Sequence, residues 1–268
     1  MTDNEFKKAL YYESLWLNKN ATLENLYQTN NLLFDVVELT QFMYKKRDKA
    51  NFITDKDEGF PEALKNTYIR AFYYNGDISI ANNKKKVAIV GTREISNTGI
   101  EVATAITKNL IKKDYTIISG LAKGVDSTAM YTTVKENSRN LIGVIGTAID
   151  EFYPKENKNL QQHIATNCLL ISHIPFYKNS FQPFKTKRLY FPQRNAIMAN
   201  LSDFTIIVEA NDKSGTLTHA KHCLKAKKQI YIMDFNEGKW VDDLVSKGAK
   251  IISNVDDIEI NDDFALSF

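Results

Sequence analysis

The chain has 268 residues, of which 43% are hydrophobic and 25% charged, and its 35 Lys and Arg against 32 Asp and Glu leave a net charge of +3. This composition excludes a disordered tail protein, a collagen-like chain and a coiled coil. Two cysteines cannot form a disulfide framework, the first residues lack the apolar core of a signal peptide, and no apolar run is long enough to span a membrane. We therefore expect a cytoplasmic protein with no membrane partner.

The first 55 residues differ in pattern from the rest of the chain. Apolar side chains recur at helical spacing over residues 5–17 and 22–44, and a polar stretch follows at 45–57. This pattern predicts a small helical module, residues 1–55, joined by a connection to a larger domain, residues 56–258. Residues 259–268 are expected to form an acidic C-terminal tail.

From residue 86 onward, short apolar runs alternate with amphipathic stretches. Most of these runs are continuous Val, Ile and Leu, which is typical of strands buried on both faces of a parallel sheet. The alternation predicts an α/β fold, with helices covering both faces of a mostly parallel sheet. The predicted strands are 87–91, 116–119, 141–146, 169–172, 204–209, 229–233 and 250–252. The predicted helices are 97–113, 124–137, 157–166, 193–201, 215–228 and 239–247.

Four strand-to-helix turns share small residues and hydroxyl groups, and two of them also carry a basic side chain nearby. In open parallel sheets, ligands bind beyond the carboxyl ends of the strands, where such turns let the backbone approach an anion. Each turn alone is also explained by tight connections and helix caps, but together they favour phosphate binding. The candidate residues are Gly91, Thr92, Arg93, Ser119, Gly120, Lys123, Ser214, Gly215 and Thr216, and the turn at 146–150 completes the set.

The fingerprints of other phosphate sites are absent from the sequence. There is neither the G-x-G-x-x-G of a dinucleotide site nor the G-x-x-x-x-G-K-[ST] of a P-loop, so no nucleotide cofactor is expected. His219, His222 and Cys223 are close enough in sequence to suggest a metal, but a solvent-facing helix next to several lysines explains them better, and we expect no metal. No catalytic group stands out, and we expect a protein that is not an enzyme.

The segment 157–202 contains no acidic residue and combines basic with aromatic side chains. Cations that follow a phosphate backbone and rings that stack on bases are what single-stranded nucleic acid requires. A long loop, expected at 174–191, that is anchored by its aromatic residues is the alternative interpretation. The basic residues are Lys158, Lys178, Lys185, Lys187, Arg188 and Arg194, and the aromatic residues are Phe176, Tyr177, Phe181, Phe184, Tyr190 and Phe191.

Residues 59–255 resemble the DNA-processing protein A (DprA/Smf) family. The resemblance rests on the sequences GFP at 59–61, VAIVGTR at 87–93, SGLAKGVD at 119–126, GTAID at 146–150, FPQRN at 191–195 and SGTL at 214–217, which follow in the family's order. It implies an extended Rossmann-like fold that binds single-stranded DNA. It also implies a homodimer that loads a RecA-type recombinase onto DNA coated by single-strand-binding protein during DNA uptake and natural transformation.

The resemblance also implies roles for individual residues. Arg93 and Arg188 would contact phosphate, Phe191 would lie against a base, and Arg194 would shape or contact the pocket. Main-chain N–H groups of the two turns at 91–92 and 119–120 would bind phosphate as well, and Lys187 and Asn195 complete the expected DNA-binding set.

Two other classes of protein remain as alternatives. The first is a nucleotide-hydrolysing enzyme similar to phosphoribohydrolases, whose P-G-G-x-G-T-x-x-E motif corresponds to 213–219 here, with His219 in place of the glutamate. The second is a nucleotide sensor that signals through the helical module at the N-terminus.

Overall fold

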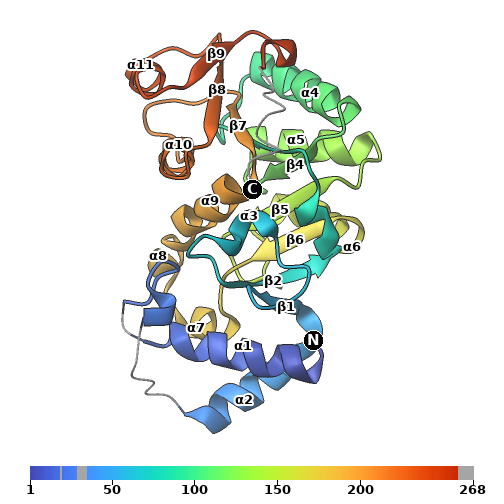
Figure 1. Ribbon diagram of the computed structural model, residues 1–268, viewed down its shortest axis with the longest axis vertical. Helices are drawn as coiled ribbons and strands as arrows, with labels where there is room; N and C mark the ends of the chain where they lie inside the picture. The colour runs from blue at the N-terminus through green and yellow to red at the C-terminus, as the bar shows by residue number, and fades with distance from the viewer. Residues whose placement is uncertain (19, 29–34, 259–268) are drawn as a thin grey trace.

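The computed structural model describes residues 1–18, 20–28 and 35–258, which form an α/β fold around one nine-stranded sheet (Figure 1). The strands are β1 (Asn51–Thr54), β2 (Ala71–Gly76), β3 (Lys86–Val90), β4 (Thr116–Ser119), β5 (Leu141–Ile145), β6 (Leu169–Ser172), β7 (Phe204–Ile207), β8 (Gln229–Met233) and β9 (Lys250–Ile252). The helices are α1 (Asp3–Trp16), α2 (Val36–Tyr44), α3 (Glu62–Lys65), α4 (Asn97–Lys112), α5 (Val125–Lys135), α6 (Lys158–Asn167), α7 (Phe176–Phe181), α8 (Phe184–Lys187), α9 (Tyr190–Leu201), α10 (Thr216–Lys225) and α11 (Lys239–Val245).

The strand order is β1-β2-β6-β5-β4-β3-β7-β8-β9. The last seven strands in this order, β6-β5-β4-β3-β7-β8-β9, are all parallel to one another. These are the seven strands that the apolar runs predict, so the mostly parallel α/β fold is confirmed. The chain builds the sheet outward from β3 through β4 and β5 to β6, and then returns to place β7 on the other side of β3. Such a change of direction leaves a crevice at the carboxyl ends of the two strands.

The prediction of a polar connection at 45–57 is wrong for part of that stretch, because residues 51–54 form β1. This strand pairs antiparallel with β2, which was not predicted either, and β2 pairs antiparallel with β6. The predicted boundary at residue 55 therefore falls between two strands of the same sheet. The helical stretch predicted over 22–44 is confirmed only in part, by α2 and by a short 3₁₀ turn, Leu26–Gln28, while residues 22–25 are not helical. Residues 29–34 and the expected acidic tail, 259–268, lie outside the described residues.

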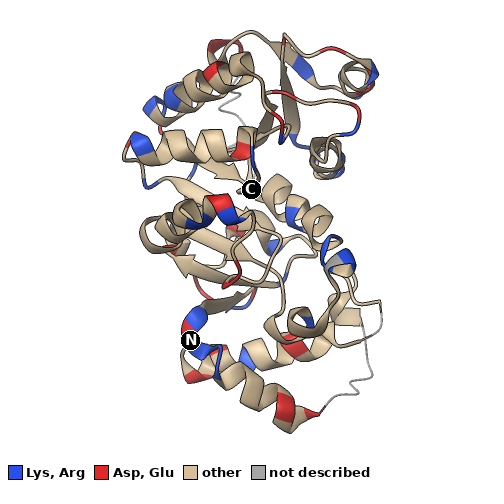
Figure 2. Cartoon of the chain, turned by 180° about the vertical axis from the view of Figure 1, so that it is seen from behind, with Lys and Arg blue, Asp and Glu red and all other residues tan. Residues whose placement is uncertain are grey.

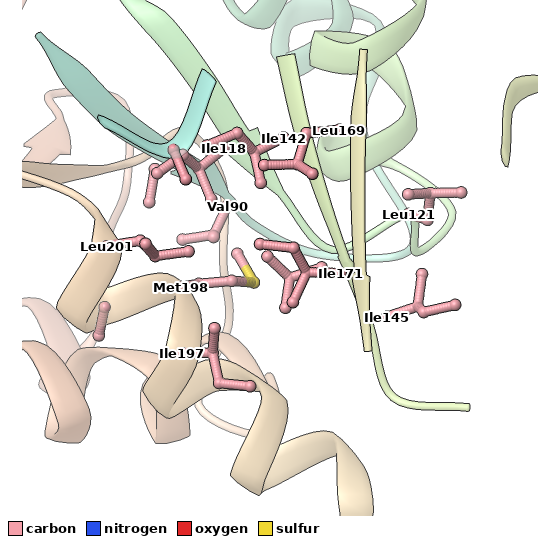
Figure 3. Close-up of a cluster of buried hydrophobic side chains, with 14 of the residues drawn as sticks. Val90, Ile118, Leu121, Ile142, Ile145, Leu169, Ile171, Ile197, Met198 and Leu201 are labelled. Atoms are coloured by element: carbon pink, nitrogen blue, oxygen red, sulfur yellow. The ribbon is translucent and has the colours of Figure 1, made fainter. Parts of the chain in front are cut away.

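Helix α9 covers one face of the sheet with its apolar side. Ile197, Met198 and Leu201 are fully buried and face Val90 and Ile171 of the sheet (Figure 3). Burying each such side chain stabilises a fold by roughly 1.5–3 kcal/mol. Helices α4, α5 and α6 lie on the opposite side of the sheet in Figure 1, so that both faces are covered as predicted. This packing fixes the position of α9, which carries the motif residues 191–195.

The N-terminal helix α1 packs on the main sheet and on the segment that follows β6. The Tyr12 hydroxyl donates a hydrogen bond to the main-chain oxygen of His173 at 2.5 Å, and Trp16 lies edge-on to Tyr190. The carboxylate of Glu13 accepts the main-chain N–H groups of Phe176 (2.6 Å) and Tyr177 (2.9 Å) at the start of α7. The first helix thus stabilises the region between β6 and α9.

Candidate functional site

The turns that follow β3, β4 and β5 meet at the carboxyl edge of the sheet, because these strands are parallel neighbours. Helix α9 crosses beside this edge, since it packs against both β3 and β5. Residues 91–93, 119–120 and 146–147 therefore lie near the motif 191–195, although long stretches of sequence separate them. The acid-free segment α8–α9 shows blue basic positions without red acidic ones in Figure 2.

Arg194 lies under this edge and is only 6% exposed. Its Nη1 donates a hydrogen bond to the main-chain oxygen of Val144 at 3.1 Å. Nη1 also lies so close to Gly120 that a Cβ atom at this position would overlap it. Arg194 is therefore directed at the ends of β4 and β5, and it shapes the edge of the sheet from inside.

Asp126 supplies the negative charge beside Arg194. Its carboxylate accepts the N–H of Gly120 at 3.1 Å. Burial raises the pKa of Asp126, while the positive charge of Arg194 opposes that rise. An arginine and a carboxylate buried on either side of one glycine hold the turn after β4 in a single arrangement.

Phe191 forms the floor of the exposed part of the site. A Cβ atom at Gly146 would lie 2.6 Å from the Phe191 ring, so the absence of a side chain there lets the ring rest on the turn after β5. The guanidinium carbon of Arg93 lies 5.9 Å from the centre of the Phe191 ring, and the Tyr153 ring lies 5.6 Å away. A cation at this distance from a ring is attracted by its π electrons.

A pocket of about 290 Å³ opens beside Phe191. It brings together Phe191, Lys187 and Arg188 from the segment 184–191 with residues of the β5 turn. Two cations and an aromatic ring around one cavity can hold a phosphate and a stacked planar group at the same time. The lining residues are Gly146, Thr147, Glu151, Phe152, Tyr153, Asn179, Lys187, Arg188 and Phe191.

The expected role of the turn N–H groups needs correction. The N–H of Thr92 donates to the main-chain oxygen of Glu209 at 2.6 Å, and that of Gly120 is taken by Asp126. Gly91 is confined by Val125 and by the Glu209 oxygen, and the Ser119 hydroxyl is buried and donates to Ile89. Two of the four expected N–H donors are therefore already engaged within the protein, and at this edge exposed side chains are left to meet a ligand.

Other candidate residues lie outside the pocket. Lys123 forms a surface ion pair with Glu156 at 2.6 Å. The turn 214–216 follows β7, and its side chains bond to each other, with the Ser214 hydroxyl donating to that of Thr216 at 2.9 Å. Asn195 is buried inside α9. The structure thus gathers Lys187, Arg188 and Phe191 around the pocket and places Arg93 beside the Phe191 ring. Arg194 is buried beneath the edge of the sheet.

Glu151 and Asn179 belong to the pocket but were not predicted to do so. Asn179 lies in α7, within the stretch 174–191 that was predicted as a long loop; the structure corrects this to the helices α7 and α8 and the start of α9. Glu151 directly follows the GTAID motif, which was the one signal in the sequence that pointed to this place. Phe176 is buried, as the anchoring interpretation requires, while the side chain of Phe184 lies outside the described part of the chain.

The expectation that His219, His222 and Cys223 lie on a solvent-facing helix is wrong for two of them. His219 and Cys223 are buried, and both contact the Thr205 hydroxyl, at 3.0 and 3.3 Å respectively. Burial lowers the pKa of His219 to about 3, which keeps the ring neutral. Among the described residues, no group of three or more His, Cys, Asp or Glu side chains is arranged to hold a metal ion. The described part of the chain also contains no helix long and apolar enough to cross a membrane.

The sheet order and the basic, aromatic pocket define an extended Rossmann-like protein with a ligand site at the carboxyl edge of its sheet. The family model of DNA recombination-mediator protein A matches residues 51–261. The chain belongs to this family, and the resemblance seen in the sequence is confirmed.

Comparisons with individual proteins agree. The chain is 31% identical to the DNA processing protein DprA of Bacillus subtilis, over 78% of this chain and 70% of that protein. The X-ray structure of DNA processing protein A (DprA) from Streptococcus pneumoniae matches with a TM-score of 0.71 and 25% identity, over 94% of this chain and 90% of the other. A structure of DNA processing protein A from Helicobacter pylori, described by its single-stranded DNA binding mode, matches with a TM-score of 0.65 and 29% identity, over 76% and 92% of the two chains.

Proposed function

We propose that this chain binds single-stranded DNA at the carboxyl edge of its sheet and acts as a recombination mediator without catalysing a reaction. The observation that carries the proposal is the Phe191 ring, which rests on Gly146 with the Arg93 guanidinium 5.9 Å away. A base can stack on such a ring while Lys187 and Arg188, which line the same pocket, neutralise the phosphates on either side. The single-stranded DNA binding mode described for the relative from Helicobacter pylori supports this assignment.

The wider role that we propose is to load a RecA-type recombinase onto DNA coated by single-strand-binding protein, in the cytoplasm and as a homodimer. Its support is the family itself, whose description is that of a recombination mediator. A mediator of this kind should speed the formation of recombinase filaments on coated DNA. The rate of filament formation with and without the protein tests this role, and light scattering in solution tests the dimer.

The binding proposal is tested by fluorescence anisotropy with labelled single- and double-stranded oligonucleotides of the same sequence. We expect tighter binding to the single strand, because only unpaired bases can stack on Phe191. The logarithm of the binding constant should fall linearly with the logarithm of the salt concentration, as released counterions require. Tight binding of a mononucleotide without binding of oligonucleotides would contradict the proposal and favour a nucleotide sensor. Release of free base from a nucleoside monophosphate would favour the enzyme alternative.

A further inference from the structure

The pocket beside Phe191 contains a carboxylate that phosphate binding does not explain. Glu151 lines it, with Lys187 Nζ 3.3 Å from its Oε1 atom. A negative charge at this place repels phosphate and weakens the attraction of Lys187 and Arg188 for it. A carboxylate favours a ligand that presents N–H donors instead.

Asn179 stands beside this carboxylate with a fixed orientation. Its Nδ2 donates a hydrogen bond to Glu151 Oε1 at 2.8 Å. The reverse orientation would place the amide oxygen against the carboxylate, so the hydrogen bond determines which end of the amide is the oxygen. The amide oxygen, Oδ1, therefore lies on the side away from Glu151 Oε1.

The Oδ1 atom of Asn179 is a buried acceptor that has no hydrogen-bond partner within the protein as described. The residue is only 2% exposed, yet it lines the pocket. Nearly all buried polar atoms in folded proteins have a partner, so an orphaned acceptor on the wall of a ligand pocket indicates that the ligand supplies the donor. The residues that line the pocket thus include two neighbouring acceptor groups, the amide of Asn179 and the carboxylate of Glu151.

We propose that Asn179 and Glu151 read the hydrogen-bonding edge of the base that stacks on Phe191, and that they favour guanine. This inference rests on the proposed function. Guanine is the one common base whose pairing edge presents two adjacent donors, the N1–H and the N2 amino group. Thymine has a single N–H between two acceptors, and in adenine and cytosine an acceptor adjoins the amino group. Two adjacent acceptors on the protein match guanine alone.

The test compares two oligothymidines that carry one central deoxyguanosine or one central deoxyinosine. Inosine lacks only the N2 amino group, so charge, length and stacking remain nearly the same. We expect the unmodified protein to bind the guanine oligonucleotide about five-fold more tightly, as one hydrogen bond provides. Whichever of Glu151→Gln and Asn179→Leu removes the acceptor of the N2 amino group should bring this ratio close to one. The other variant removes the acceptor of N1–H, which inosine retains, and should weaken the binding of both oligonucleotides alike. Glu136→Gln, which breaks a surface ion pair with Lys108, should leave the ratio unchanged.

The outcomes separate the inference from the proposed function. Equal binding of the two oligonucleotides by the unmodified protein overturns the inference, and so does a ratio that survives both Glu151→Gln and Asn179→Leu. Either result leaves single-stranded DNA binding intact, whereas no binding to either oligonucleotide refutes the proposed function itself. Because Asn179 is buried, a thermal melt shows whether its variant is folded. If it is not, Glu151→Gln, at a partly exposed position, decides: it should either bring the ratio close to one or weaken the binding of both guanine and inosine oligonucleotides, and no change in either quantity overturns the inference.

Discussion

The buried carboxylate of Glu13 accepts the hydroxyl hydrogen of Tyr73 at 2.6 Å, which ties the N-terminal helix to strand β2. The same carboxylate accepts two N–H groups at the start of α7, the helix that carries Asn179. Burial raises the pKa of Glu13 from 4.5 to about 7, although these hydrogen bonds act in the opposite direction. One side chain thus connects the first helix, the antiparallel edge of the sheet and the pocket segment.

Glu13 should make the stability of the fold depend on pH. Because its pKa is higher in the folded than in the unfolded chain, the folded state binds the additional proton between pH 4.5 and 7. The contribution of this group to stability is therefore complete below pH 4.5 and is lost as the pH rises to about 7, by about 3 kcal/mol in total.

Urea unfolding at several pH values between 4.5 and 7 measures how the free energy of unfolding changes with pH. Glu13→Gln should remove the part of this pH dependence that Glu13 causes, while Glu101→Gln, at an exposed position of α4, should retain it. If the free energy of unfolding changed with pH in the same way in the unmodified protein and in the Glu13 variant, Glu13 would not be the group responsible.

Gly120→Ala should disturb the site and the fold together. The new Cβ atom would overlap Arg194 Nη1 and lie 2.6 Å from Asp126 Oδ2, so the buried arginine has to move. Overpacking of this kind costs roughly 1–3 kcal/mol of stability. Thermal unfolding and oligonucleotide binding measure both effects. Gly215→Ala is the matched control, because a Cβ atom at that position meets nothing within 4 Å, and it should behave like the unmodified protein.

Asp126→Asn should destabilise the fold by roughly 3 kcal/mol, because Arg194 would keep its charge in a buried place without a compensating carboxylate. Adding Arg194→Met to this variant removes the isolated charge and should recover part of the loss. Chemical unfolding of the single and double variants forms a double-mutant cycle. Strictly additive losses would show that the two side chains act independently.

Phe191→Ala should lower the affinity for single-stranded oligonucleotides by roughly 5- to 100-fold, since one stacking interaction is worth about 1–3 kcal/mol. The slope of the logarithm of the binding constant against the logarithm of the salt concentration should not change, because the substitution removes no charge. The matched control is Phe181→Ala, which truncates a ring of the same segment that is 60% exposed. A loss of affinity as large for Phe181→Ala as for Phe191→Ala would refute the stacking role.

Arg188→Ala should change the salt dependence instead. Removing one phosphate contact should reduce the slope of log binding constant against log salt by about 0.7 for a single strand. Anisotropy titrations at several salt concentrations measure the slope. Arg139→Ala is the control: it removes an exposed arginine that precedes β5, whereas the pocket lies at the other end of this strand, beside Gly146. This variant should leave the slope unchanged. An unaltered slope in the Arg188 variant would exclude a phosphate contact by this residue.

The parallel part of the fold could be read from the sequence because its cause is local. Strands such as β3 and β5 are buried on both faces, and this burial demands the continuous apolar runs that mark them. The antiparallel strands β1 and β2 were missed because each is short and mixes polar with aromatic residues. Their strand geometry depends on pairing with each other and with β6, which is a contact between distant parts of the chain.

In the candidate site, too, some features could be predicted from the sequence and others depend on the tertiary structure. Its basic and aromatic members, such as Arg188 and Phe191, could be predicted because their chemistry is visible in the residue types and in the family motif. Only the tertiary structure decided which groups are free to act: it engages the N–H groups of Thr92 and Gly120 within the protein, and it buries Arg194. It also brings Glu151 and Asn179 side by side in the lining of the pocket. Sequence by itself determined the chemical character of the site, because side-chain type is local, whereas burial and hydrogen-bond partners depend on the packing of distant elements.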